Sequence, residues 1–146
     1  MEQLSLISSN DGDALYKLWV DKIIRHSKLV AALVNGPAVG IACTTLALCD
    51  VVLASDQAYF YCPFTQLGLN PEAASSYTFV HIMGYQKAVR LALLGEEMSA
   101  KEAHNAGLVT KVISHATFET ETGNLISNYS RLAHQASASL KGQGNQ

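Results

Sequence analysis

Two short apolar runs constrain the fold of this chain more than any other feature of its sequence. "KLVAALV" covers residues 28–34 and ends at the turn residues 35–37, and "DVVLAS" covers residues 50–55. Both are continuous rather than alternating, which is typical of strands that are buried on both faces of a parallel sheet. A glycine-containing turn and a helix-length segment lie between them. This order predicts an α/β fold with buried parallel strands, right-handed crossovers and flanking helices.

The remaining segments predict helices around these strands. Residues 1–12 have a loop composition and are expected to form a flexible N-terminal segment. A helix is expected from Asp13, because apolar residues recur after it at helical spacing. These residues are Leu15, Leu18, Trp19 and Ile23. The further elements are expected as a buried helix from Val39, a strand over 58–62, helices over 71–83 and 86–94, a strand over 108–113 and a helix over 117–140.

The segment "MSAKEAHNAGLVTKVIS" has the clearest local signature in the chain. Ser99 is a favourable N-cap, and Glu102 stands three residues later, where a capping-box partner belongs. Gly107 follows the apolar positions and is expected to end the helix. This segment therefore predicts a short helix with both ends defined.

The composition argues against several classes of function. The 146 residues suit one domain, and the net charge of −2 without a basic block disfavours a nucleic-acid or anionic membrane surface. The odd set of cysteines has no CxxC pair, and the histidines lack metal-site spacing, so no metal is expected. Residues 35–37 interrupt the longest apolar stretch, and the N-terminus lacks an apolar signal region, so neither a membrane span nor a signal peptide is expected.

The turn "NGPAVGIA" is a first candidate site. A strand that leads through Gly40 into a helix leaves free N–H groups at the helix start, which can hold an anion or the oxygen of a polarised carbonyl. The turn matches neither a dinucleotide fingerprint nor a P-loop. A structural interpretation stays open, in which Gly40 only lets the helix pack close to a strand.

Glu72 is a second candidate, within "GLNPEAASSYTF". Asn70 as N-cap, Pro71 as first helical residue and Glu72 in the first turn would explain the residue by helix capping alone. The apolar residues around it would equally suit a general base. Local sequence leaves both interpretations open.

These segments together resemble the enoyl-CoA hydratase/isomerase (crotonase) superfamily. The ordered motifs are "NGPAVG", "CD", "AYFYCPF", "GLNPE" and "AGLV", and the resemblance is close over residues 28–113 and weaker to about residue 141. Within the superfamily the chain is most similar to the Δ3,Δ2-enoyl-CoA isomerases of the peroxisomal type. The resemblance implies a partial ββα spiral fold, with residues 13–116 forming the core.

The resemblance also implies roles for individual residues. The two catalytic glutamates of hydratases would fall at Thr44 and Phe64, so addition of water to a double bond is not expected. The glutamate of the isomerases falls at Glu72, which would be the catalytic base, and the Ile41 N–H would be an oxyanion-hole donor. The substrate, a fatty acyl-CoA that itself contains the coenzyme A, would need no further cofactor. The residues expected to bind it are Ala38, Gly40, Pro63, Phe64, Leu67 and Leu69.

Family domains are longer than this chain, so a unit shortened at both ends is expected. Its strands before residue 13 would be missing, and residues 117–146 would form a shortened C-terminal helical region, which would weaken the trimer of the family. An intracellular protein of peroxisomes or mitochondria is implied, although no targeting signal is recognised. One alternative is a non-catalytic interaction module of the chromodomain Y-like type or an inactive short form. Another is a residual hydratase.

Overall fold

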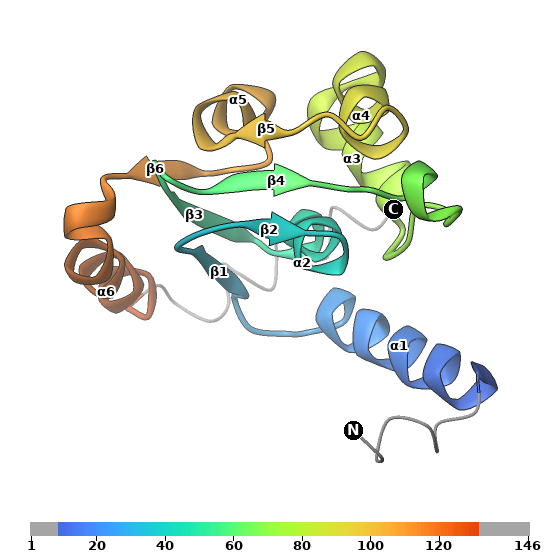
Figure 1. The fold of residues 1–146 in the computed structure, drawn as a ribbon. Coiled ribbons are helices and arrows are strands. Elements are labelled where there is room, and N and C mark those ends of the chain that lie inside the picture. The colour runs from blue at the N-terminus through green and yellow to red at the C-terminus, as the bar shows by residue number, and fades with distance from the viewer. Residues whose placement is uncertain (1–8, 132–146) are drawn as a thin grey trace, which may run out of the picture.

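The computed structural model describes residues 9–131 of the chain. Figure 1 shows strands in the middle, α3, α4 and α5 on one side, and α1 extending away from the strands. The elements are α1 (Ser9–Ile24), β1 (Ala31–Val34), β2 (Ala38–Val39), α2 (Ile41–Thr44), η1 (Thr45–Leu48), β3 (Val51–Ser55), β4 (Tyr59–Tyr61), η2 (Thr65–Leu67), α3 (Ser75–Met83), α4 (Tyr85–Ala92), β5 (Met98–Ser99), α5 (Ala100–Ala106), β6 (Lys111–Ile113), η3 (His115–Thr117) and α6 (Phe118–Tyr129).

The strands form two small sheets that are mainly parallel. In the first sheet, β3 lies between β1 and β6 and is parallel to both. In the second, β4 lies between β2 and β5, parallel to β2 and antiparallel to β5. This arrangement confirms the predicted α/β class with parallel strands.

The two apolar runs behave differently in the sheet. Val52, Leu53 and Ala54 of β3 are at most 3% exposed, so the prediction of burial on both faces is correct for this strand. It is wrong for β1, where Leu33 is 49% exposed. The reason is position, because within the described residues β1 pairs only with β3 and stands at an edge.

The main core joins both sheets to the helices above them. Phe60 of β4, Phe79 of α3 and Leu91 of α4 are fully buried in it. Successive residues of β3 point to opposite faces, so Leu53 leaves this core and packs with Ile113 and Phe118 in a second cluster. Through this second cluster, α6 packs against the first sheet.

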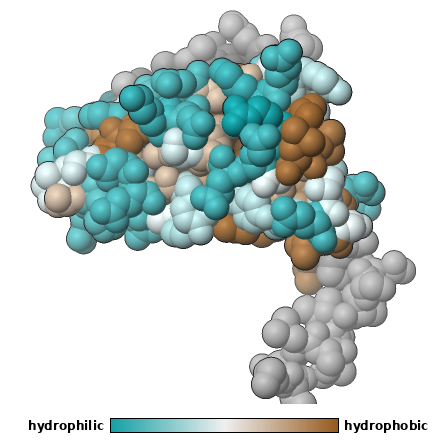
Figure 2. Space-filling view, turned by 45° about the horizontal axis from the view of Figure 1, so that its top comes forward, coloured by the Kyte–Doolittle hydropathy of each residue, from teal (hydrophilic) through white to brown (hydrophobic). Residues whose placement is uncertain are grey.

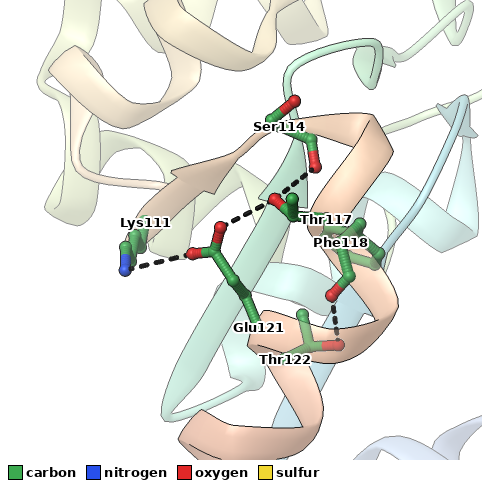
Figure 3. A network of polar contacts seen from close by, with 6 residues as sticks. All are labelled: Lys111, Ser114, Thr117, Phe118, Glu121 and Thr122. Atoms are coloured by element: carbon green, nitrogen blue, oxygen red, sulfur yellow. Dashed lines mark hydrogen bonds and ion pairs between the residues drawn. The ribbon is translucent and has the colours of Figure 1, made fainter.

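The start of α6 is held by a small polar network (Figure 3). The Thr117 hydroxyl donates to Glu121 Oε1 over 2.7 Å and to the Ser114 carbonyl over 3.4 Å. Lys111 Nζ of β6 lies 3.8 Å from Glu121 Oε2. The network therefore connects α6 to the strand before it. The helix ends at Tyr129, so the prediction of one helix running on to residue 140 is wrong at this point, and residues 132–140 lie outside the described residues.

Helix α1 begins at Ser9, four residues before the predicted start at Asp13. Residues of the Ser, Asn and Asp type favour the first turn of a helix as well as a loop, so composition did not separate the two. Leu15, Leu18 and Trp19 are between 43% and 59% exposed. In Figure 2 the largest brown, apolar patch lies toward the right end of the visible face, smaller brown areas lie elsewhere, and hydrophilic residues cover most of the rest.

The capping box of α5 forms as predicted. The Ser99 hydroxyl accepts from the Glu102 N–H over 3.3 Å, and Glu102 Oε2 accepts from the Ser99 N–H over 2.9 Å and from its hydroxyl over 2.7 Å. Gly107 ends the helix with a left-handed φ of 92°. These hydrogen bonds from Ser99 lower the pKa of Glu102.

Replacing Ser99 by alanine is expected to lower the free energy of unfolding by about 1 kcal/mol at neutral pH. Since the folded-state pKa of Glu102 lies below its unfolded value, the stability from this carboxylate is present above the unfolded pKa and is lost as pH falls through the folded pKa. Urea unfolding of wild type and Ser99→Ala should therefore differ less in acid than at neutral pH. Ser99→Thr keeps the hydroxyl and is the control, and a difference that grows in acid would contradict the prediction.

Candidate functional site

A glycine turn connects β2 to α2. Gly40 has φ of 59° and ψ of −123°, a conformation that residues with a Cβ rarely adopt. Its N–H donates to the Tyr61 carbonyl over 2.8 Å, which fixes the turn to β4. A Cβ built on Gly40 would meet no atom within 4 Å. Glycine is thus required for its conformation rather than for close packing of a helix on a strand, and the space beside it is open.

The helix after this turn is shorter and later than predicted. The prediction of a helix from Val39 is wrong, because Ala38 and Val39 pair with β4 as a strand. The N–H groups of Cys43 and Thr44 both donate to the Gly40 carbonyl, over 2.9 and 3.0 Å. Among the described residues the Ile41 N–H has no acceptor. A free N–H beside open space can donate to a polarised carbonyl oxygen.

The structure divides the residues expected to contact substrate into three groups. Ala38 and Phe64 are 4% and 2% exposed and belong to the main core, so they do not face an open pocket. Leu67 and Leu69 are 65% and 57% exposed and present an apolar surface. Gly40 and Pro63 are half-buried at the ends of β2 and β4. The six residues therefore differ widely in burial within the described chain.

Glu72 lies in a tight turn and not in a helix. Its carbonyl accepts from the Ser75 N–H over 2.9 Å, and its side chain is half-buried. Ala73 and Ala74 follow with φ of 52° and 57°. Left-handed backbone costs roughly 1–2 kcal/mol for a residue that is not glycine. Two such residues in succession mark a strained segment held by its surroundings, as is common at functional sites.

The predicted helix cap at Asn70 and Pro71 is therefore wrong. Helix α3 begins only at Ser75, with the left-handed Ala74 at its N-cap. Alanine has the strongest intrinsic preference for helix, so the sequence favoured an early start that tertiary contacts override. Since Glu72 stands outside the helix, capping no longer explains its presence.

Tyr16 of α1 faces the Glu72 turn and was not singled out by the sequence. Its hydroxyl oxygen is buried, and it has no hydrogen-bond partner among the described residues. Burial raises the pKa of Tyr16, and the Glu72 carboxylate raises it further, whereas the Ala73 amide opposes the rise without reaching hydrogen-bond geometry. The signal that could have revealed Tyr16 is its spacing from Val20 on one helix face, where a polar aromatic residue needs a partner.

The two positions at which the hydratases carry their catalytic glutamates hold buried side chains without a carboxylate. Thr44 is fully buried, and its hydroxyl donates to the Ile41 carbonyl over 3.2 Å. Phe64 is packed in the core. Across residues 9–131, no three metal-ligating side chains gather, and no helix is long and apolar enough to cross a membrane. Of the three positions at which the resemblance places a catalytic glutamate, only residue 72 carries a carboxylate.

Comparisons with known proteins agree with this arrangement. The family model described as enoyl-CoA hydratase/isomerase matches residues 8–145. Enoyl-CoA delta isomerase 2 of Rattus norvegicus is 46% identical over 125 residues, and enoyl-CoA delta isomerase 3, peroxisomal, of Mus musculus is 50% identical over 115. These matches cover 86% and 79% of this chain but 32% and 36% of the relatives. The chain thus spans about a third of their length.

Two further comparisons bear on fold and function. Chromodomain Y-like protein 2 of Mus musculus is 38% identical over 103 residues, which cover 70% of this chain and 20% of that protein. The crystal structure of an enoyl-CoA hydratase from Mycobacterium avium subsp. paratuberculosis K-10 superposes with a TM-score of 0.87 at 34% identity. It is matched over 91% of this chain and 55% of its own. The fold is therefore crotonase-like.

Proposed function

Because the chain belongs to the enoyl-CoA hydratase/isomerase family, we propose that it carries the reacting part of an enoyl-CoA isomerase. The substrate would be an unsaturated fatty acyl-CoA with its double bond at position 3, and the product a 2-trans-enoyl-CoA. This reaction belongs to the oxidation of unsaturated fatty acids. Relatives named as enoyl-CoA delta isomerases, at 46% and 50% identity, support the assignment.

The proposed mechanism uses one side chain and one backbone group. The Glu72 carboxylate removes a proton from C2, the electron pair moves toward the thioester, and the carbonyl oxygen becomes an enolate. The Ile41 N–H donates to that oxygen, and one such donor contributes about 3–4 kcal/mol to lowering the barrier. Glu72 then returns the proton to C4, so that atoms and charge balance without a cofactor.

One observation carries the proposal. Glu72 is held in a strained turn outside the helix, while the other two positions where the family could place a carboxylate are a buried threonine and a buried phenylalanine. A single base suits a reaction that moves one proton between two carbons of the same substrate. Addition of water would need further acid and base groups that Thr44 and Phe64 do not supply.

The surroundings of the site would supply binding. We expect the exposed side chains of Leu67, the last residue of η2, and of Leu69 to contact the apolar acyl chain. A homo-trimer, and a location in peroxisomes or mitochondria, are part of this proposal. For the peroxisome, the name of the mouse relative supports this part of the proposal.

A second candidate is a non-catalytic acyl-CoA or protein-binding module. The similarity to chromodomain Y-like protein 2 over 70% of the chain favours it, as does the wide exposure of Leu67 and Leu69. In that case the crotonase-like fold would serve only to bind a ligand, and the Glu72 turn would be inherited from an enzyme without taking part in catalysis.

An assay of the 146-residue chain with a 3-enoyl-CoA and, separately, a 2-enoyl-CoA distinguishes these functions. We expect the first to give the 2-trans isomer and the second to give no hydrated product. Hydration of the 2-enoyl-CoA would make the chain a hydratase. Tight binding of both thioesters without turnover would support the binding module.

A further inference from the structure

We propose that Tyr16 is a positioning residue for Glu72, with its phenol hydroxyl donating a hydrogen bond to the carboxylate. This inference rests on the proposed function and adds to it a residue from a helix that precedes both reacting groups in the chain. It follows from the way α1 packs against the Glu72 turn.

The geometry places Tyr16 beside that turn. A groove of about 250 Å³ lies between α1 and the turn, lined by Tyr16, Lys17, Val20, Asp21, Ile24, Ala73 and Ala74. The ring of Tyr16 lies against Trp19, with 6.3 Å between centroids, which orients the ring. Across the groove from Tyr16 lie Ala73 and Ala74, the two residues that directly follow Glu72 in the chain.

Both groups lack a partner in the described residues. The Tyr16 oxygen is buried without a hydrogen bond. Within residues 9–131, the Glu72 carboxylate accepts no hydrogen bond and forms no ion pair either. Leaving a buried hydroxyl without a hydrogen bond costs free energy, so we expect the Tyr16 hydroxyl to donate to the Glu72 carboxylate.

The other charged groups at this groove do not compete. Asp21 on α1 is engaged by Arg25, whose Nε lies 2.6 Å from Asp21 Oδ1. Lys17 on α1 is exposed and has only donors, so it cannot accept from the phenol. On the facing turn, the Ala73 amide is a donor as well. Glu72 is the acceptor that remains.

The hydrogen bond would hold the carboxylate in one orientation during the reaction. A base that serves two carbons must keep its oxygens aligned with the plane of the substrate, and loss of alignment lowers the rate without weakening binding. Replacing Tyr16 by phenylalanine keeps the ring against Trp19 and removes only the hydroxyl. We expect kcat to fall roughly tenfold with KM within about twofold of wild type.

The matched control is Tyr85→Phe, which removes the hydroxyl of a tyrosine that is 70% exposed on α4. We expect its kcat and KM to equal those of the wild type. A Tyr16→Phe variant that keeps wild-type kcat would overturn the proposal. So would a rise in KM at unchanged kcat, since that would indicate a binding role.

A second measurement does not depend on turnover. Tyrosines labelled with ¹³C at Cζ are titrated by NMR in the wild type and in Glu72→Gln. Because the Glu72 charge raises the pKa of Tyr16, we expect this pKa to fall in the variant, while Tyr85 titrates as before. An unchanged Tyr16 titration overturns the pairing. If the Tyr16 pKa falls in Glu72→Gln but the wild type does not turn over 3-enoyl-CoA, the proposed reaction is refuted and the pairing stands.

Discussion

Glu72→Gln is expected to lower kcat for isomerisation of a 3-enoyl-CoA by about 10²–10⁴-fold, the usual contribution of a general base. Glutamine has nearly the same shape, so the strained turn at Ala73 and Ala74 should survive, but an amide cannot accept the C2 proton. KM should change little, because substrate binding does not require the proton transfer. The measurement is steady-state kinetics followed at the absorbance of the conjugated product.

The control for this prediction is Glu97→Gln, an exposed carboxylate in the turn before β5. It should retain the wild-type rate, which would show that loss of one negative charge is harmless in itself. Equal rates for Glu72→Gln and wild type would remove Glu72 from the mechanism, whatever its place in the turn.

Gly40→Ala is expected to lower kcat by about 10²–10³-fold, as loss of an oxyanion-hole donor does. The added methyl group meets no atom within 4 Å, so crowding is not the cause. The cause is the φ of 59°, which alanine resists and which sets the direction of the Ile41 N–H. If this φ relaxes, the peptide between Gly40 and Ile41 rotates and its N–H points elsewhere. If the turn keeps its conformation under strain, the variant should lose on the order of 1–3 kcal/mol of stability.

Gly36→Ala is the matched control for this variant. Gly36 lies four residues earlier, has no left-handed φ, and would also meet no atom on addition of a Cβ. Kinetics and urea unfolding of the two variants should therefore separate the effect of conformation from that of added volume. Equal turnover by both would mean that the Gly40 turn does not position an essential donor.

The confirmed predictions mostly concern features that depend on residues close together in the sequence. The box of Ser99 and Glu102 and the stop at Gly107 depend on residues within one helix, so their pattern was sufficient. The burial of β3 also agrees with its continuous apolar run, and it holds because β3 lies between β1 and β6 in the sheet.

The predictions that failed concern features that distant segments decide. The run over residues 28–34 predicts a strand buried on both faces, but β1 is half-exposed, because it stands at the edge of its sheet and the run itself does not reveal its neighbours. The first turn of α3 was placed too early, because "NPEAA" has excellent local helix signals. The sequence offered no sign that Ala73 and Ala74 would take left-handed φ values.

By itself the sequence determined the family, the α/β class and the residue types available for chemistry, with an acid at Glu72 and none at Thr44 or Phe64. These follow from the order of side chains along the chain. Only the tertiary structure decided that Glu72 stands outside a helix and that the Tyr16 hydroxyl is buried at its turn. Both depend on packing between segments far apart in sequence, which can override local preference because many weak contacts together outweigh a left-handed backbone of roughly 1–2 kcal/mol per residue.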